Sequence, residues 1–244
     1  MNRKLYWGSV LLLVAAILGL VEAQFHLFRS LFGPTSLGHR EIATQFLGEY
    51  LATHYSGKKV VVLSNPFSTQ PGQPREVYQY EKAGLRGLRC GLGNKVTIEQ
   101  VAYPEIRPAF FKDRRSVPID PATTTPLSYI VAEDALDKIS RQYPQAEIFV
   151  SLIGLPINVL QTETWKAGRK FALLLPDLRM LGDQSSIRAA FQSGKIAAIV
   201  LNKPGAPADN QPLGRDPKME FSLRFLLVTP ENVDQCLKAY PRLF

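Results

Sequence analysis

Histidine is scarce in this chain of 244 residues. The three histidines, at positions 26, 39 and 54, all precede the first β-branched run that could form a strand. A Ser-His-Asp or Cys-His nucleophile system, or a histidine-rich metal site, would have to recruit its base or ligand from that leading segment. The patterns G-x-S-x-G, G-x-x-x-x-G-K-[ST], H-E-x-x-H and paired C-x-x-C are missing. We therefore expect no catalytic residue of these classes, no metal and no cofactor.

Cysteine is also rare, with only Cys90 and Cys236. On a helix, Cys90 would point away from the apolar face that Leu88 and Leu92 form, and Cys236 falls in a predicted C-terminal helix. An oxidising compartment would permit a bridge between them, but nothing in the sequence requires one.

Charged residues make up 20% of the chain and hydrophobic residues 45%, a balance that suits one globular domain with an ordinary core. The formal net charge is +8. The densest basic stretch, Lys112-Asp113-Arg114-Arg115, is flanked by prolines and has no aromatic residues interleaved along a strand, so nucleic-acid binding is not expected. A solvated loop, or weak attraction to anionic lipid or cell-wall polymer, explains it better.

The first 23 residues predict export from the cytoplasm. Arg3 and Lys4 precede a charge-free apolar run from Leu5 to Val21, followed by Glu22-Ala23. This arrangement is typical of a signal peptide, while 17 apolar residues also approach the length of a membrane anchor. Both outcomes place the protein in the cell envelope, in a periplasmic or extracytoplasmic location. Residues 24–38 then read as an amphipathic juxtamembrane arm, and residues 39–244 as the folded domain.

The domain alternates between apolar runs and helical patterns. Continuous apolar runs are typical of buried parallel strands, whereas the run at 96–101 alternates and should lie nearer an edge. Predicted strands are Lys59–Leu63, Val96–Val101, Ile148–Ile153, Phe171–Leu175, Ile196–Leu201 and Phe221–Val228. Predicted helices are 40–55, Val77–Leu92, Ile130–Tyr143, Ser185–Ser193 capped by Asp183, and a C-terminal helix capped by Thr229 that ends at Tyr240. This order predicts an α/β fold with a single open, doubly wound, mostly parallel sheet.

Three segments resemble one lobe of the type I periplasmic binding proteins of transport systems. They are Lys59–Asn65, Tyr80–Leu88 with its G-L-x-G-L pattern, and Ala146–Pro156 with its glycine-containing turn. The resemblance covers about Lys59 to Gly205. It implies a sheet of the flavodoxin-like or periplasmic-binding-lobe type. The family needs two such lobes around its ligand, and this chain has residues for one, so the resemblance supports fold and export more than transport.

Polar and turn-forming residues follow several predicted strands. Because the carboxyl ends of parallel strands open on the same edge of a sheet, a ligand crevice is expected there. The candidate ligand-binding residues are Asn65, Ser68, Ser151, Gly154, Asp177 and Asn202. We expect Asn65, Ser151 and Asp177 to reach one pocket.

These residues favour a non-catalytic binding or sensing domain for a small molecule or an envelope partner. One alternative is a hydrolase or transferase that acts on an envelope component through Asp177, Glu105 or Ser151. Another is a structural protein that docks by the apolar side chains of its arm, Phe25, Phe28 and Phe32.

Overall fold

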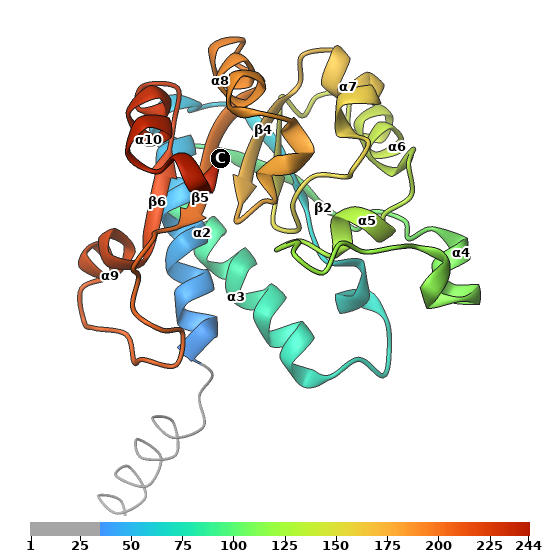
Figure 1. The fold of residues 1–244 in the computed structure, drawn as a ribbon, viewed down its shortest axis with the longest axis horizontal. Coiled ribbons are helices and arrows are strands. Elements are labelled where there is room, and N and C mark those ends of the chain that lie inside the picture. Colours follow the sequence, from blue (N-terminus) through green and yellow to red (C-terminus); the bar gives the residue numbers. More distant parts are fainter. Residues whose placement is uncertain (1–34) are drawn as a thin grey trace, which may run out of the picture.

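The structure is a computed structural model that describes residues 35–244. The predicted export segment and the first eleven residues of the predicted arm lie outside the described residues. Within residues 35–244, no helix is both long and apolar enough to cross a bilayer. The described chain places a central sheet between two layers of helices (Figure 1).

The sheet contains six strands in the order β2-β1-β3-β4-β5-β6. The first five are parallel and β6 runs antiparallel to β5. Strands β1 and β3 are neighbours near the centre of the sheet, where Val62 pairs with Val150 and neither is exposed. The predicted edge position of β2 is confirmed. The strands are β1 (Lys59–Leu63), β2 (Thr97–Ala102), β3 (Ile148–Ser151), β4 (Lys170–Leu174), β5 (Ile196–Asn202) and β6 (Phe225–Val228).

Helices cover both faces of the sheet, so its continuous apolar runs are buried on two sides. One core holds Val60 and Val62 against α2, α3 and α9. The other holds Val61 and Leu63 and includes residues of α5, α6, α7, α8 and α10. The α-helices are α2 (Thr35–His54), α3 (Arg75–Leu92), α4 (Pro108–Lys112), α5 (Leu127–Ile130), α6 (Ala135–Gln142), α7 (Glu163–Lys166), α8 (Gln184–Gln192), α9 (Pro217–Arg224) and α10 (Val233–Ala239). Short 3₁₀ turns are η1 (Pro66–Thr69), η2 (Arg114–Ser116), η3 (Val159–Gln161), η4 (Leu178–Leu181) and η5 (Pro241–Leu243).

Helices α2 and α3 pack backbone to backbone through glycine. A Cβ on Gly87 would lie 2.0 Å from the carbonyl oxygen of Glu41, and one on Gly91 would lie 2.0 Å from that of Gln45. Any side chain at either position would force the helices apart. This close helix packing explains why glycine recurs in this stretch of α3.

Two helices differ in the structure from their predicted bounds. The stretch 130–143 is split into α5 and α6, because Val131 pairs with Ile106 and the amide of Ala132 donates to the carbonyl of Glu105 at 2.8 Å. The C-terminal helix begins at Val233, not next to Thr229, because Asn232 Oδ1 accepts the Thr229 amide at 2.8 Å. Asp183 does cap α8 as predicted, accepting the Ser186 amide at 2.8 Å.

The prediction of one strand over Phe221–Val228 is wrong in its first half. Residues 217–224 form α9, and only Phe225–Val228 pairs with β5. Asp216 caps the helix by accepting from Lys218 and Met219, and Pro217 occupies its first turn. At the other boundary, α2 begins at Thr35, so the last four residues of the predicted arm are helical.

Candidate functional site

The topology fixes where a ligand crevice should lie. Strand β1 sits between β2 and β3, so the chain leaves β1 in one direction and later returns to its other side. The loops that follow β1 and β3 therefore diverge, and this switch point is where open α/β sheets bind ligands. Two cavities open along the carboxyl edge of the described sheet.

The first, the Arg40 cavity, lies at the switch point and has a volume of about 170 Å³. Helices α2 and α3, the ends of β3 and β4 and the loop before α5 all contribute to its wall. Its lining residues are Arg40, Asn65, Tyr80, Glu81, Thr124, Thr125, Pro126, Leu127, Leu152, Ile153, Leu174 and Leu175.

A buried polar network holds Arg40 in that wall. Its Nη2 donates to Glu81 Oε2 at 3.2 Å and to the Leu152 carbonyl at 3.1 Å. Glu81 also accepts a short hydrogen bond from the Ser64 hydroxyl, at the end of β1. The side chains of Arg40 and Glu81 are 6% and 4% exposed, so each charge depends on the other. The guanidinium also lies 4.2 Å from the ring centre of Tyr80.

The second, the Asp177 cavity, has a volume of about 360 Å³ and lies at the ends of β4 and β5. Asp177 accepts from Arg179 Nη2 at 2.6 Å and from the Thr123 hydroxyl at 2.7 Å. These partners, Arg179 foremost, hold the pKa of Asp177 below its usual value, so it stays ionised and is a poor proton donor near neutral pH. The lining residues are Ala122, Thr124, Leu175, Pro176, Asp177, Leu178, Arg179, Leu201, Asn202, Arg242, Leu243 and Phe244.

Leu175 and Thr124 line both cavities, which therefore adjoin. Leu175 has a φ of 46°, the left-handed region that a leucine rarely adopts. Its amide donates to the Val200 carbonyl at 2.8 Å, which fixes this backbone at the end of β4. Such strain persists only where the surroundings impose it, and it is common at ligand sites.

The structure separates the predicted site residues. Asn65 lines the Arg40 cavity and caps η1 by accepting the Phe67 amide at 2.9 Å. Asp177 and Asn202 line the Asp177 cavity. Ser151 is buried and its hydroxyl donates to the Gly154 carbonyl at 2.5 Å, so it lines neither cavity. Asn65, Ser151 and Asp177 thus do not share a single cavity.

Ser68 and Gly154 serve local turns. The Ser68 hydroxyl donates to the Asn65 carbonyl at 2.6 Å. Gly154 has a φ of 81° and borders a separate apolar void of about 10 Å³. A water molecule barely fits such a void, so it is no ligand site.

Arg40, Tyr80 and Glu81 are not among the predicted site residues, because they lie on helices and not at strand ends. A signal was present: Arg40 shares its helical stripe with Ala43 and Leu47, and Glu81 shares one with Gly84 and Leu88. A charged residue on an otherwise apolar stripe is buried, and buried charges need partners.

The side chains that the hydrolase alternative would use, Asp177, Glu105 and Ser151, form separate contacts. Glu105 is exposed, pairs with Lys138 at 2.8 Å and lines neither cavity. Within residues 35–244, no cluster of three or more His, Cys, Asp or Glu side chains could hold a metal ion. Cys90 is exposed and Cys236 is buried, and both are free thiols.

No family model matches the chain, and no curated protein matches it. Solved structures do resemble it. One is an ABC transporter solute-binding protein from Burkholderia graminis C4D1M in complex with D-arabinose, with 13% identity, a TM-score of 0.46 and coverage of 79% of this chain and 60% of that one. Another is a solute-binding protein from Mycobacterium smegmatis with bound glycerol (12% identity, TM-score 0.46, coverage 80% and 60%).

A third is the sugar-binding protein of a sugar ABC transporter from Bacillus halodurans, with 12% identity, a TM-score of 0.43 and coverage of 80% and 64%. The chain spans about three fifths of the length of these proteins. The resemblance to periplasmic binding proteins that the sequence indicates is thereby confirmed, and it concerns the fold alone.

Proposed function

We propose that this chain is an exported or membrane-anchored, non-catalytic binding domain that holds a small polar molecule in the Arg40 cavity. The observation that carries the proposal is the buried Arg40–Glu81 pair in the wall of a cavity at the switch point of the sheet. Burying two charges is costly and contributes little to stability, so a role in orienting a ligand accounts for the pair better.

The wall chemistry favours an uncharged polar ligand. Glu81 balances the charge of Arg40, so the wall carries no net charge from this pair. Both hydrogen bonds that the guanidinium forms within residues 35–244 come from Nη2, and its buried Nε has no partner there, so the guanidinium keeps unused donors beside the cavity. Leu152, Ile153 and Leu174 supply the apolar remainder, and mostly apolar walls with a few polar groups are typical of small-molecule sites.

The proposed envelope location depends on residues 1–23, whose basic start and apolar run are typical of an export segment. An alkaline-phosphatase fusion at Phe244 should be active in bacteria. An inactive fusion beside a bright, soluble cytoplasmic fluorescent fusion would place the domain inside the cell.

Binding is tested by thermal unfolding of the full chain against a library of small polar metabolites. Tyr80→Ala removes a cavity wall and the ring under Arg40, and Tyr103→Ala is the matched control. The two tyrosines are 39% and 40% exposed, and Tyr103 lines neither cavity. A ligand at about 100 times its Kd stabilises the folded state by roughly 2.7 kcal/mol. We expect that gain in the unsubstituted chain and in Tyr103→Ala, and its loss in Tyr80→Ala. If no compound raises the melting temperature, or the gain survives Tyr80→Ala, the Arg40 cavity is not the working site.

A further inference from the structure

Residues 107–116 form a projecting basic-aromatic arm, and we infer that it contacts the surface of an anionic lipid bilayer. The arm comprises α4 and η2 and follows the carboxyl end of β2. It lines neither the Arg40 cavity nor the Asp177 cavity, so the inference is independent of the proposed function.

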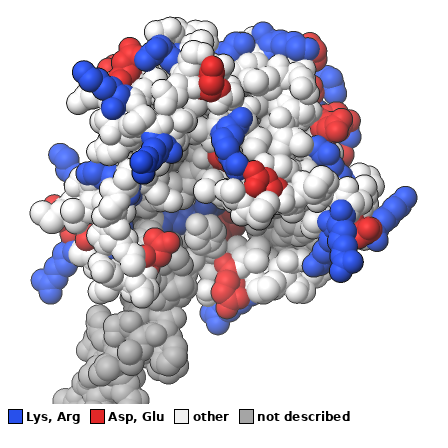
Figure 2. All heavy atoms as spheres, in the orientation of Figure 1, with Lys and Arg blue, Asp and Glu red and all other residues white. Residues whose placement is uncertain are grey.

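Three cations of the arm face solvent. Lys112, Arg114 and Arg115 are exposed, and none takes part in the ion pairs seen within residues 35–244. Arg107, at the base, does pair with Glu133 at 3.6 Å. The one acid of the arm, Asp113, uses its carboxylate to accept the Arg115 amide at 2.9 Å. Figure 2 shows this basic group on the side of the molecule where Figure 1 places α4.

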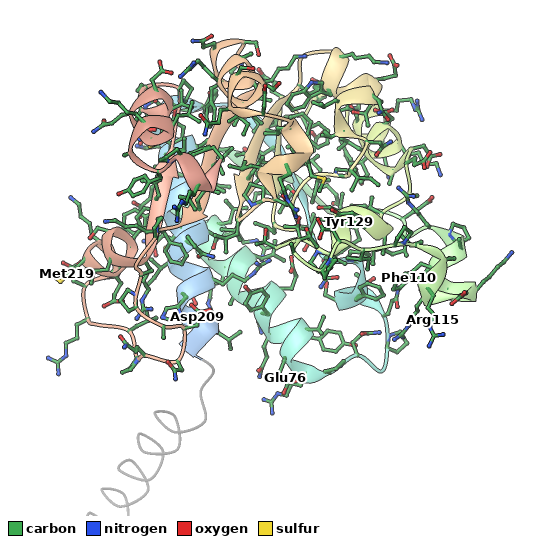
Figure 3. All side chains as sticks on the ribbon, in the orientation of Figure 1. Glu76, Phe110, Arg115, Tyr129, Asp209 and Met219 are labelled. Carbon is green, nitrogen blue, oxygen red and sulfur yellow. The ribbon has the colours of Figure 1, made fainter. Side chains whose placement is uncertain are left out.

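An exposed aromatic side chain accompanies these charges. Phe111 is 60% exposed, among the largest values for an apolar side chain in residues 35–244. Its ring meets that of Phe110 edge-on at 6.1 Å, and Phe110 packs 6.3 Å from Phe67 of η1. Figure 3 shows Phe110 and Arg115 on the outer flank of the domain. A protruding phenyl ring among cations is the pattern of segments that insert at a bilayer interface.

Hydrogen bonds make the arm a defined structure. The amide of Asp113 donates to the Ala109 carbonyl at 2.9 Å. The Ser116 hydroxyl lies 2.7 Å from the Asp113 carbonyl and 3.1 Å from the Ala109 carbonyl. An ordered arm loses little conformational entropy on contact, so a few charges and one ring suffice for a weak surface attraction.

The arm lies at the same edge of the sheet as the start of α2. Helix α2 runs into β1 and therefore begins near the carboxyl edge, where Arg40 reaches the Leu152 carbonyl after β3. The arm leaves β2 at that same edge, and Figure 1 shows α4 and the start of α2 in the same half of the molecule. If the apolar run of residues 5–21 anchors the chain, as one of the two sequence-based expectations has it, this edge should face the bilayer.

The experiment uses the full chain reconstituted in vesicles whose lipids carry bromine in their acyl chains, which quenches nearby tryptophan. Phe111→Trp reports on the arm, and Met219→Trp on α9 is its control, since Met219 is 61% exposed. The unsubstituted chain supplies the background of Trp7 and Trp165. We expect extra quenching for Phe111→Trp alone, in vesicles containing phosphatidylglycerol and not in phosphatidylcholine. This extra quenching should disappear in about 1 M salt, where exposed charges more than about 3 Å apart are largely screened.

A charge-reversal triple tests the cations. Replacing Lys112, Arg114 and Arg115 together by Glu should remove the extra quenching, because each cation strengthens binding to an anionic surface about fivefold. Replacing Arg89, Lys95 and Lys238 together by Glu makes the same change in charge at exposed positions outside the arm and should leave the quenching intact. The inference would be overturned if tryptophan were quenched equally at positions 111 and 219, or if quenching did not depend on lipid charge or on the three cations of the arm. An absence of quenching at position 111 would also overturn it, and is the result expected of an arm that binds a protein.

Discussion

Replacing Glu81 by Gln should destabilise this protein far more than its single lost charge suggests. The substitution removes the counter-charge of Arg40, whose side chain is 6% exposed. A buried charge left without its partner costs about 3–5 kcal/mol, a large share of the roughly 5–15 kcal/mol that stabilises a domain. Urea unfolding followed by circular dichroism, with linear extrapolation to water, measures the loss. The double variant Arg40→Met/Glu81→Leu should recover much of it, because neither charge then remains.

The same two helices provide the control. Arg86 and Glu41 also bridge α2 and α3, at 2.5 Å, but their side chains are 57% and 32% exposed. Glu41→Gln should therefore cost less than about 1 kcal/mol. Equal losses for Glu81→Gln and Glu41→Gln would show that burial does not govern the Arg40–Glu81 pair, and the argument for a ligand-orienting arginine would lose its basis.

Three further predictions concern packing and pH. Gly87→Ala should lower the free energy of unfolding by several kcal/mol, because the added Cβ would meet the Glu41 carbonyl. This loss should outweigh the gain of about 1 kcal/mol by which alanine favours a helix over glycine. Denaturant unfolding measures the change, with the exposed Arg89→Ala as the near-neutral control. Val62→Asp or Val150→Asp should prevent folding, since an unpaired carboxylate between central strands costs several kcal/mol; a soluble, cooperatively melting variant would contradict the strand assignment. Burial lowers the pKa of His39, and the positive charge of Arg224 lowers it further, while Asp209 and Glu220 act in the opposite direction. The folded state therefore resists protonation of His39. Stability should therefore fall as pH drops from about 6.5 toward the folded-state pKa, and His39→Phe should flatten that part of the melting-temperature curve.

The sheet was predictable because its strands leave a strong signal. Runs such as Ile196–Leu201 contain apolar residues without interruption, and this happens only where helices cover both faces of a strand. The same rule misled at Phe221–Val228. There Asp216 and Pro217 begin a helix, and Arg224 closes it four residues after Glu220. The capping residues lie outside residues 221–228, so that stretch alone does not show where the helix begins.

The site was predictable only in part. Strand-end positions follow from topology, and Asn65, Asp177 and Asn202 do line cavities. The register of a turn does not follow from topology, so nothing in the sequence showed that the Ser151 hydroxyl bends back to Gly154. The helical stripes of Arg40 and Glu81 indicate that these charges are buried, but not that they face a cavity. Arg40 and Glu81 come together from positions far apart in the chain, which only the packing of α2 on α3 decides.

The loop before α5 forms a fixed wall of the Arg40 cavity. Here Thr124, Thr125 and Pro126 wall the Arg40 cavity, and the loop is tied across the sheet edge. The Thr123 hydroxyl donates to Asp177 at 2.7 Å, and Asp120 pairs with Arg179 at 2.6 Å. A wall fixed in this way is preformed. The binding proposed for this cavity would therefore need no rigid-body closure, and its selectivity would come from the shape and hydrogen bonds already present around Arg40.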